Sequence, residues 1–418
     1  MNRRQFGGLS LSTLAGLYGA PLLQRPAAAQ AGGGFFFRDG DRVVMIGDSI
    51  TEQHLHSNYV ESYVVSRFPT WNLAFRNAGI GGDTSTGGNN RTQRDILSFN
   101  PTAVTITFGM NDAGYRYPPD PARLDAYVKG LQGMMDQLKA KSLRVAILSA
   151  SPVEKKEDGQ ALEGYNQTLE IFAENAKGVA TRNGALFVDQ FHPHVAALQK
   201  ARDTSAAMRI NGGDAVHPGP SGQLLMAWAI LKGLGAPALV SSTTVDAATG
   251  RAISAVNATV FAVRKKPAGV SFIRSDRALP LWIPEAARPI LSWAPVVQDL
   301  NQYPLTIAGL PAGDYRLLID DEPCGTVSAA ALSSGFNLAT LTQGPIARQA
   351  AAVQEAVFAK NRYFHDQIFR GVVLNNGVPA DQKTAMIQER MKGMPALEQA
   401  IRDHLSLRPH RFEVVKAG

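Results

Sequence analysis

Residues 42–236 alternate short apolar runs with longer amphipathic stretches. Most of the apolar runs are rich in β-branched or aromatic residues and have the length of buried strands. They lie at 43–46, 73–77, 103–108, 145–149 and 186–188. Helical patterns separate them at 58–67, 90–98, 121–140 and 161–182, and a last helix is expected at 221–234. This alternation predicts an α/β fold in which a parallel sheet lies between two layers of helices.

The pattern changes after residue 236. Short strands are expected at 258–263, 270–273, 305–307 and 315–319, separated by turn signals such as PAGD (311–314) and DDEP (320–323). Helical periodicity returns at 346–369 and 381–404, and 411–415 could form a final strand. We therefore expect an α/β domain over 32–238, a β-rich module over 239–343 and a helical C-terminal region over 344–418.

The first 31 residues have the pattern of a signal peptide. A start with paired arginines, MNRRQF, precedes an apolar stretch from 9 to 23 and the small-residue segment AAAQA (27–31). The arginine pair resembles a twin-arginine export signal, which predicts a periplasmic or extracellular bacterial protein. An uncleaved membrane anchor is the alternative, although the apolar stretch is short for a bilayer span. After processing, no stable membrane insertion is expected.

Composition and charge exclude several classes of function. Hydrophobic residues make up 45% and charged residues 18% of the 418 residues, as in soluble globular proteins. The formal net charge of +7 would fall to +4 without the three leader arginines, and no long basic run occurs. Nucleic acid is therefore not an expected partner. With Cys324 as the single cysteine, an intramolecular disulfide and a multi-thiolate metal site are impossible.

Four short motifs carry candidate chemistry. GDSIT (47–51) follows the first predicted strand, GIGGDT (79–84) the second and GMND (109–112) the third, while DAVH (214–217) precedes the last helix. Because ligands bind at the carboxyl ends of parallel strands, these motifs are expected to share one edge of the sheet. These motifs offer a serine at a strand-to-helix turn, glycines that let backbone N–H groups approach a ligand, an amide donor and an acid–imidazole pair.

The motifs resemble those of the SGNH hydrolases, also called the GDSL esterase/lipase family, over about residues 42–236. The resemblance implies a three-layer α/β/α flavodoxin-like parallel sheet, here with a C-terminal β-rich module and helical tail. It also implies a catalytic triad of Ser49, Asp214 and His217. The oxyanion hole would comprise Ser49, Gly82 and Asn111. Ile50 stands where the family name has leucine, and the G-x-S-x-G elbow of α/β-hydrolases is absent. No cofactor and no metal are expected.

Other polar residues near the motifs have competing interpretations. Asp48 and Asp112 are expected to hydrogen-bond their turns rather than act in catalysis. Asp189, His192 and His194 could bind a metal, but their spacing matches no familiar ligand set, and histidines packing a loop are expected instead. The acidic and basic residues of 154–158 are expected to be solvated. The tyrosines of 115–117 should overhang the pocket, where they either stack on a sugar or pack under their loop.

The sequence thus predicts an exported serine esterase that hydrolyses carboxylic esters through an acyl-enzyme. Export, the appended β-rich module and the tyrosines favour O-acetyl groups on carbohydrates, so the expected partner is a small-molecule or polysaccharide ester. A short-chain or aryl esterase, a lysophospholipase or a thioesterase is the alternative within the same chemistry. A catalytically inactive carbohydrate-binding or envelope protein is the alternative of another class, although it would not need an intact triad.

Overall fold

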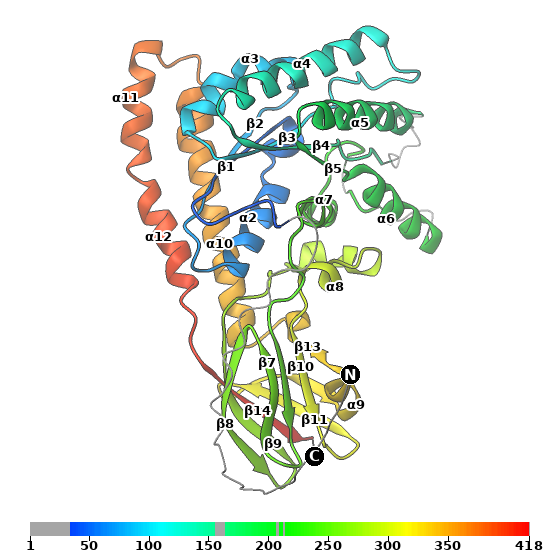
Figure 1. The fold of residues 1–418 in the computed structure, drawn as a ribbon, viewed down its shortest axis with the longest axis vertical. Coiled ribbons are helices and arrows are strands. Elements are labelled where there is room, and N and C mark those ends of the chain that lie inside the picture. Colours follow the sequence, from blue (N-terminus) through cyan, green and yellow to red (C-terminus); the bar gives the residue numbers. More distant parts are fainter. Residues whose placement is uncertain (1–33, 155–163, 206–208, 212–213, 418) are drawn as a thin grey trace, which may run out of the picture.

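The computed structural model describes residues 34–154, 164–205, 209–211 and 214–417. The predicted leader (1–31), and with it the export signal and the anchor alternative, lies outside the described residues. An α/β part, a β-sandwich and a long helical segment that runs along both form an elongated molecule (Figure 1). Among the described residues, no helix is long and apolar enough to cross a membrane.

Five parallel strands form the central sheet in the order β2-β1-β3-β4-β5. They are β1 (Arg42–Gly47), β2 (Ala74–Gly79), β3 (Ala103–Thr107), β4 (Arg144–Leu148) and β5 (Leu186–Val188). All five residues of β3 are buried, as expected for a strand covered by helices on both faces. The predicted flavodoxin-like α/β sheet is confirmed, and every strand lies within two residues of its predicted bounds.

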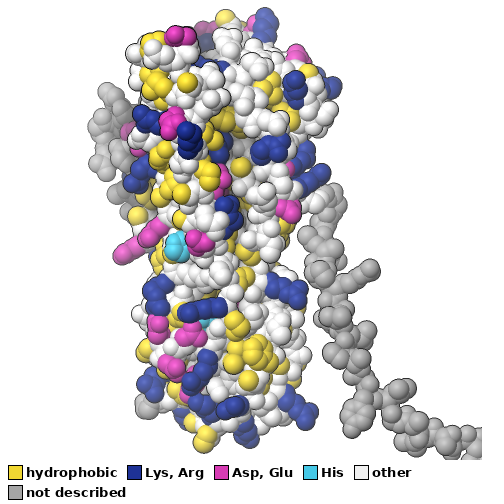
Figure 2. Space-filling model, turned by 90° about the vertical axis from the view of Figure 1, so that its left-hand side faces the viewer, with side chains coloured by type: hydrophobic (Ala, Val, Ile, Leu, Met, Phe, Trp, Pro, Cys, Tyr) yellow, Lys and Arg dark blue, Asp and Glu magenta, His cyan; other side chains and the backbone are white. Residues whose placement is uncertain are grey.

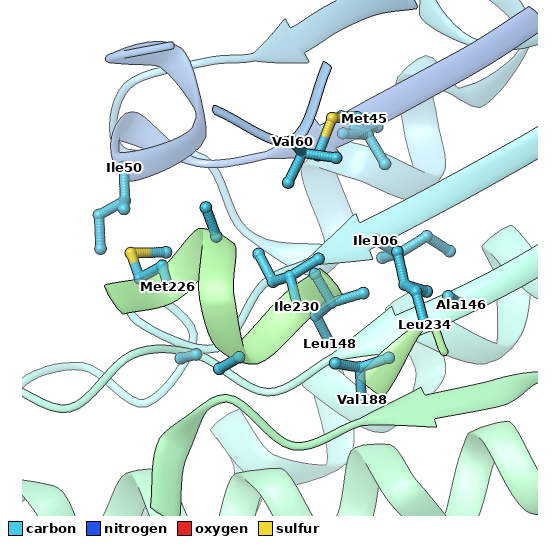
Figure 3. Close-up of a cluster of buried hydrophobic side chains, with 14 of the residues drawn as sticks. Met45, Ile50, Val60, Ile106, Ala146, Leu148, Val188, Met226, Ile230 and Leu234 are labelled. Atoms are coloured by element: carbon cyan, nitrogen blue, oxygen red, sulfur yellow. The ribbon is translucent and has the colours of Figure 1, made fainter. Parts of the chain in front are cut away.

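Helices cover both faces of this sheet (Figure 1). One layer contains α3 (Ser85–Asp95), α4 (Pro121–Lys139) and α5 (Tyr165–Arg182), and the other contains α2 (Leu55–Arg67) and α7 (Pro220–Gly233). Figure 3 shows how α7 is held: Ile230 and the adjacent Leu234 lie beside strand side chains such as Leu148 and Ile106, and Met226 lies beside Ile50. The four-residue α1 (Ser49–Glu52) follows β1 directly.

One helix of this part was not predicted. Residues expected to form a loop are the first turn of α6 (Phe191–Thr204), which contains His192 and His194. Pro193 lies in that first turn, where a missing backbone N–H costs no helical hydrogen bond. His192 and His194 therefore lie on a helix and not in a loop, because a proline within the first turn is compatible with a helix.

The β-rich module is a sandwich of two sheets, ordered β13-β10-β6-β7 and β12-β11-β14-β9-β8. Its strands are β6 (Ser242–Asp246), β7 (Arg251–Val256), β8 (Ala258–Lys266), β9 (Gly269–Asp276), β10 (Pro304–Ala308), β11 (Asp314–Ile319), β12 (Glu322–Ser328), β13 (Phe336–Asn337) and β14 (His410–Lys416). The β-rich module is thus confirmed, and Cys324 is buried in it. β14, the last strand of the chain, pairs with β11 and β9.

Shorter helices connect these parts: η1 (Leu97–Phe99), η2 (Glu285–Ser292), α8 (Val296–Leu300), α9 (Ala329–Ser334) and η3 (Leu338–Thr340). The helical C-terminal region comprises α10 (Pro345–Tyr363), the π-helix η4 (Phe364–Val373), α11 (Ala380–Met391) and α12 (Met394–His404). On the face that Figure 2 shows, basic and acidic side chains are interspersed rather than segregated.

A buried ion pair fastens α10 to α2. Lys360 and Glu61 are almost fully buried and contact each other directly. Asn361 donates to Oε2 of Glu61 and to Oδ1 of Asn58, each at 2.7 Å. Buried charges are tolerated only when paired and hydrogen-bonded, as these are. The C-terminal region is therefore bound into the α/β part and does not hang free of it.

Candidate active site

The carboxyl ends of β1, β2 and β3 lie level with one another, because Gly47 pairs with both Gly79 and Thr107. The residues that follow these three strands therefore meet at one edge of the sheet. They include Ser49 after β1, Gly82 after β2 and Asn111 after β3. The sequence-based expectation that the motifs share this edge is confirmed.

Ser49 is the first residue of α1, and its side chain is partly exposed. The turn that presents it is tightly packed: a Cβ atom on Gly47 would lie 2.2 Å from Oγ1 of Thr51 and 2.7 Å from the carbonyl oxygen of Thr107. Asp48 caps the helix by accepting the Ile50 N–H at 3.0 Å. Because α1 is one turn long, the Ser49 N–H acts as a local donor and gains little from a helix dipole.

His217 connects Ser49 with Asp214. Oγ of Ser49 lies 2.8 Å from Nε2 of His217, and Nδ1 of His217 lies 2.8 Å from Oδ2 of Asp214. With the Nδ1 proton directed at the carboxylate, Nε2 is left as an acceptor for the serine hydroxyl. The other Asp214 oxygen accepts the backbone N–H groups of Val216 at 2.7 Å and His217 at 2.6 Å.

These hydrogen bonds keep the Asp214 carboxylate ionised. Partial burial alone raises the pKa of Asp214, but the hydrogen bonds from His217 and Val216 outweigh it and lower the pKa below its ordinary value. The site is open to solvent, with 52% of the Asp214 side chain and 33% of the His217 side chain exposed. A fixed negative charge behind a solvent-accessible imidazole suits an imidazole that accepts and returns a proton.

Gly82 and Asn111 lie beside each other across the same edge. Nδ2 of Asn111 donates to the carbonyl oxygen of Asp83 at 2.9 Å. Gly82 has φ +75°, a left-handed conformation that side chains disfavour, while the space around its Cβ position is open. The glycine therefore satisfies a backbone requirement of the turn and does not relieve crowding. The amide has a second N–H in addition to the one that the Asp83 carbonyl accepts.

Arg91 was not singled out by sequence analysis, yet it joins the ends of β1 and β2 to this turn. Its Nε donates to Oδ2 of Asp83 at 2.7 Å, and its Nη atoms donate to the carbonyls of Ala78 at 2.7 Å and Gly47 at 3.0 Å. An arginine in an otherwise polar stretch of α3 gives no signal in the sequence that it is buried. These hydrogen bonds show that Arg91 supports the loop that contains Gly82.

Asp48 and Asp112 bind their turns, as predicted. Asp112 accepts the N–H of Ser85 at 2.9 Å, its hydroxyl at 2.6 Å and the N–H of Gly109 at 3.0 Å. Burial raises the pKa of Asp112 despite these hydrogen bonds. Burial also raises the pKa of Asp48 to about 7, because the Ile50 N–H and the nearby His217 offset only part of its effect. Asp48 is therefore a costly group to ionise beside Ser49.

The two tyrosines of the 115–117 loop behave differently. Tyr115 stacks on Tyr165, with ring centroids 5.1 Å apart, and its hydroxyl donates to Oδ1 of Asn111 at 2.8 Å. Tyr117 is 54% exposed. Tyr115 is thus held by its contacts although 41% of it is exposed, and Tyr117 is the more exposed of the two rings.

Two expectations about neighbouring polar residues require correction. Glu154 is buried, not solvated, because its carboxylate accepts the N–H groups of Ile210 and Asn211. The rest of that charged segment, 155–158, lies outside the described residues. His192 is exposed and bonds Asp189 and Glu170, whereas His194 is buried and bonds Asn211. Positions two apart on a helix do not face each other, so α6 does not bring these imidazoles together.

Comparison with known proteins supports the same reading of the motifs. A profile described as the GDSL-like Lipase/Acylhydrolase family matches residues 45–225. An acetylxylan esterase of Geobacillus stearothermophilus is 26% identical over 217 residues, which span 47% of this chain and 94% of the esterase. A solved structure of a gut microbial diltiazem-metabolizing enzyme is 26% identical, with a TM-score of 0.80 over 91% of this chain and 98% of that one.

The last comparison extends across the β-sandwich and the helical region, so the whole architecture has a precedent among solved structures. The profile match, in contrast, covers the strands and turns that carry the four motifs. A family of lipases and acylhydrolases indicates an enzyme that hydrolyses ester bonds. Residues 45–225, which carry the GDS, GGDT, GMND and DAVH motifs, match the GDSL-like lipase and acylhydrolase family, and this match supports assigning the chain to the SGNH hydrolases.

Proposed function

We propose that this protein is a serine esterase that works through an acyl-enzyme, with Ser49 as nucleophile. The observation that carries the proposal is the continuous chain of two 2.8 Å contacts from Ser49 Oγ through His217 to Asp214. His217 takes the hydroxyl proton at Nε2 as Ser49 attacks the carbonyl carbon of the ester. It then protonates the leaving alcohol, and water repeats the sequence in reverse to release the acid.

The negative charge that forms on the carbonyl oxygen needs donors already in place. We assign this role to the N–H groups of Ser49 and Gly82 and to the second N–H of the Asn111 amide. The contact between Asn111 and the Asp83 carbonyl supports the assignment, since it keeps the amide next to the Gly82 turn. Preorganised donors of this kind supply a large part of the rate of acyl transfer.

The substrate we propose is an O-acetyl group on a carbohydrate. The acetylxylan esterase relative supports this choice. The exposure of Asp214 and His217 also supports it. A site that is open to solvent around these two side chains accepts a bulky alcohol more readily than a site that encloses a long acyl chain. The exposed ring of Tyr117 offers a face for a sugar ring.

The test is hydrolysis of p-nitrophenyl esters of increasing acyl length, followed by acetate release from acetylated xylooligosaccharides. The proposal expects activity that falls steeply beyond short acyl chains and is lost in Ser49→Ala. Ser333→Ala, an exposed serine of α9, serves as the matched control. Preference for long chains would exclude the acetyl proposal. Glycan binding without turnover by the parent protein would favour the carbohydrate-binding alternative.

A second candidate is hydrolysis of a small drug-like ester. It rests on the full-length likeness to the diltiazem-metabolizing enzyme, which includes the appended domains. Diltiazem therefore belongs in the same substrate panel. Turnover of diltiazem at a higher kcat/KM than acetylated xylooligosaccharides would favour this candidate over the carbohydrate one.

We also propose export through a twin-arginine route, on the basis of the MNRRQF start and the apolar stretch after it. Expression with the full leader should yield mature protein in the periplasm, with a new N-terminus near residue 30. Replacing both Arg3 and Arg4 by lysine should retain the precursor in the cytoplasm. Unchanged periplasmic yield of that variant would exclude the twin-arginine route.

A further inference from the structure

Glu52, the last residue of the helix that begins with Ser49, connects the candidate active site to the C-terminal helical region. Its Oε2 accepts the backbone N–H of Gly81 at 2.6 Å. Its Oε1 accepts Nε of Arg370 at 2.5 Å and contacts Nε2 of His365 at 3.4 Å. Only 15% of the Glu52 side chain is exposed, so this carboxylate is a partly buried junction and not a surface ion pair.

Both C-terminal partners come from η4, a π-helical segment of ten residues. π-helical segments are rare and are frequently found at functional sites. The wide π-helical turn requires a glycine at position 371, because a Cβ atom there would lie 2.6 Å from the Asp366 carbonyl oxygen. The turn directs Arg370 toward the edge of the α/β part, where its Nη2 lies 4.0 Å from the Cβ position of Gly81.

The charges at this junction reinforce one another. Burial alone would raise the pKa of Glu52, but hydrogen bonds from His365 and Arg370 and the Gly81 N–H outweigh it and lower the pKa to about 2. The Glu52 carboxylate in turn raises the pKa of His365, whose other nitrogen bonds Asp366 at 2.7 Å. Glu52 is therefore a full negative charge at any working pH, and its bond to Gly81 N–H is charge-assisted.

Gly81 immediately precedes Gly82, so the Gly81–Gly82 peptide carries the Gly82 N–H that we assign to the oxyanion hole. Two glycines in sequence have no side chain to restrict this peptide, and Gly82 is already in the left-handed region. Anchoring the Gly81 N–H on Glu52 removes part of that freedom on one side. The Arg91–Asp83 contact restrains the chain on the other side.

We propose that Arg370, assisted by His365, is a positioning residue for the oxyanion loop: it holds the Glu52 carboxylate, and Glu52 holds Gly81. The inference rests on the proposed serine esterase and adds that the C-terminal helical region is part of its catalytic apparatus. Arg370 acts through Glu52 and has no direct role in the chemical step. A substitution should therefore alter turnover more than substrate binding.

The kinetic test compares Arg370→Ala, Arg370→Lys and Glu52→Gln on p-nitrophenyl acetate. Arg370→Ala should lower kcat about 10-fold with little change in KM, since small misplacement of a catalytic group is costly. Arg370→Lys should recover part of the loss, because lysine keeps the charge but forms fewer hydrogen bonds. Arg370→Ala should have little further effect in the Glu52→Gln background. A higher KM at unchanged kcat would overturn the proposal and assign Arg370 to substrate binding.

Arg348→Ala is the matched control. Arg348 of α10 is exposed and forms a comparable two-nitrogen pair with Glu322 of the β-sandwich strand β12. Its loss should change neither kcat nor the melting temperature by more than a small amount. An equal fall of kcat in Arg348→Ala and Arg370→Ala would show a general stability effect and would also overturn the proposal.

A second measurement does not depend on activity. Backbone hydrogen exchange of the peptide containing Gly81 and Gly82 is compared between Ser49→Ala and Ser49→Ala/Arg370→Ala. The proposal expects at least about 10-fold faster exchange of the Gly81 amide in the double variant, with the rest of the α/β part unchanged. Faster exchange in the double variant, together with no esterase activity in the parent protein, would retain the positioning role and reject the proposed function. Unchanged exchange in the double variant, together with esterase activity in the parent protein, would reject the positioning role and retain the proposed function.

Discussion

The hydroxyl of Tyr115 donates a hydrogen bond of 2.8 Å to Oδ1 of Asn111, the side chain we assign to the oxyanion hole. The Asp83 carbonyl can only accept, so the Asn111 atom that faces it at 2.9 Å must be the amide nitrogen. These two contacts fix the orientation of the amide. One N–H is used by Asp83, and the other remains for a developing oxyanion.

Tyr115→Phe should therefore weaken catalysis without altering the fold. A neutral hydrogen bond contributes about 1 kcal/mol net, which corresponds to about a 5-fold fall in kcat on p-nitrophenyl acetate. Tyr117→Phe is the matched control, because the Tyr117 ring is exposed and its loop is the same. Equal activity of Tyr115→Phe and the parent would show that the amide needs no such support.

Asn111→Ala should have a larger effect. Removing one oxyanion donor commonly lowers turnover about 10²–10³-fold, with KM changed much less. Circular dichroism and the melting temperature should stay close to those of the parent, because Asn111 is only partly buried. Retention of more than about a tenth of the parent kcat would remove Asn111 from the proposed oxyanion hole.

Asp48 predicts a dependence of stability on pH. Its pKa is raised to about 7 in the folded protein by burial, while an unfolded aspartate titrates near pH 4. Between these values the unfolded state binds fewer protons, so the stability that is fully present below about pH 4 is lost as the pH rises through about 7. Each pH unit in this window costs about 1.4 kcal/mol.

Asp48→Asn should remove that loss, because the amide oxygen can still accept the Ile50 N–H. The free energy of unfolding relative to the parent should improve by about 2 kcal/mol between pH 5 and pH 8. Thermal unfolding at the two pH values measures this. Asp203→Asn, an exposed position on α6, is the control. A melting-temperature difference that stays the same at both pH values would contradict a buried, neutral Asp48.

The buried ion pair between Lys360 of α10 and Glu61 of α2 predicts that breaking the pair lowers the free energy of unfolding and that a second substitution restores part of it. Lys360→Met leaves Glu61 buried with only Asn361 as a partner, which should destabilise the protein by about 3–5 kcal/mol. Lys360→Met with Glu61→Gln should recover much of this, because the amide keeps the bond to Asn361 without a charge. Chemical denaturation measures the stability of the single and the double variant. Equal stability of the two would contradict the claim that the unpaired charge of Glu61 causes the destabilisation.

Sequence reasoning located the sheet and the motifs well, for a physical reason. Strands such as β3 are buried on both faces and so read as unbroken apolar runs, and the motifs follow them directly. Strand β7, in contrast, is largely exposed and carries little periodic signal, so it was not predicted. The helix α6 was not predicted either.

The contacts that support the site could not be predicted in the same way. Arg370 and Glu52 are 318 positions apart, and nothing in either local pattern indicates that they meet. Glu154 was expected in solvent because charged residues surround it in the sequence, whereas the fold places two backbone N–H groups against its carboxylate. Local pattern predicts which face of an element is apolar, but long-range polar partners emerge only from the assembled fold.

The central claim is that Ser49, activated by His217, forms the acyl-enzyme. The most direct test treats the mature protein with a fluorophosphonate and locates the adduct by peptide mass spectrometry. We predict one adduct, on the peptide that contains Ser49, absent in Ser49→Ala and strongly slowed in His217→Ala, with loss of esterase activity in proportion to labelling. An adduct on another residue, or full esterase activity in Ser49→Ala, would contradict the account.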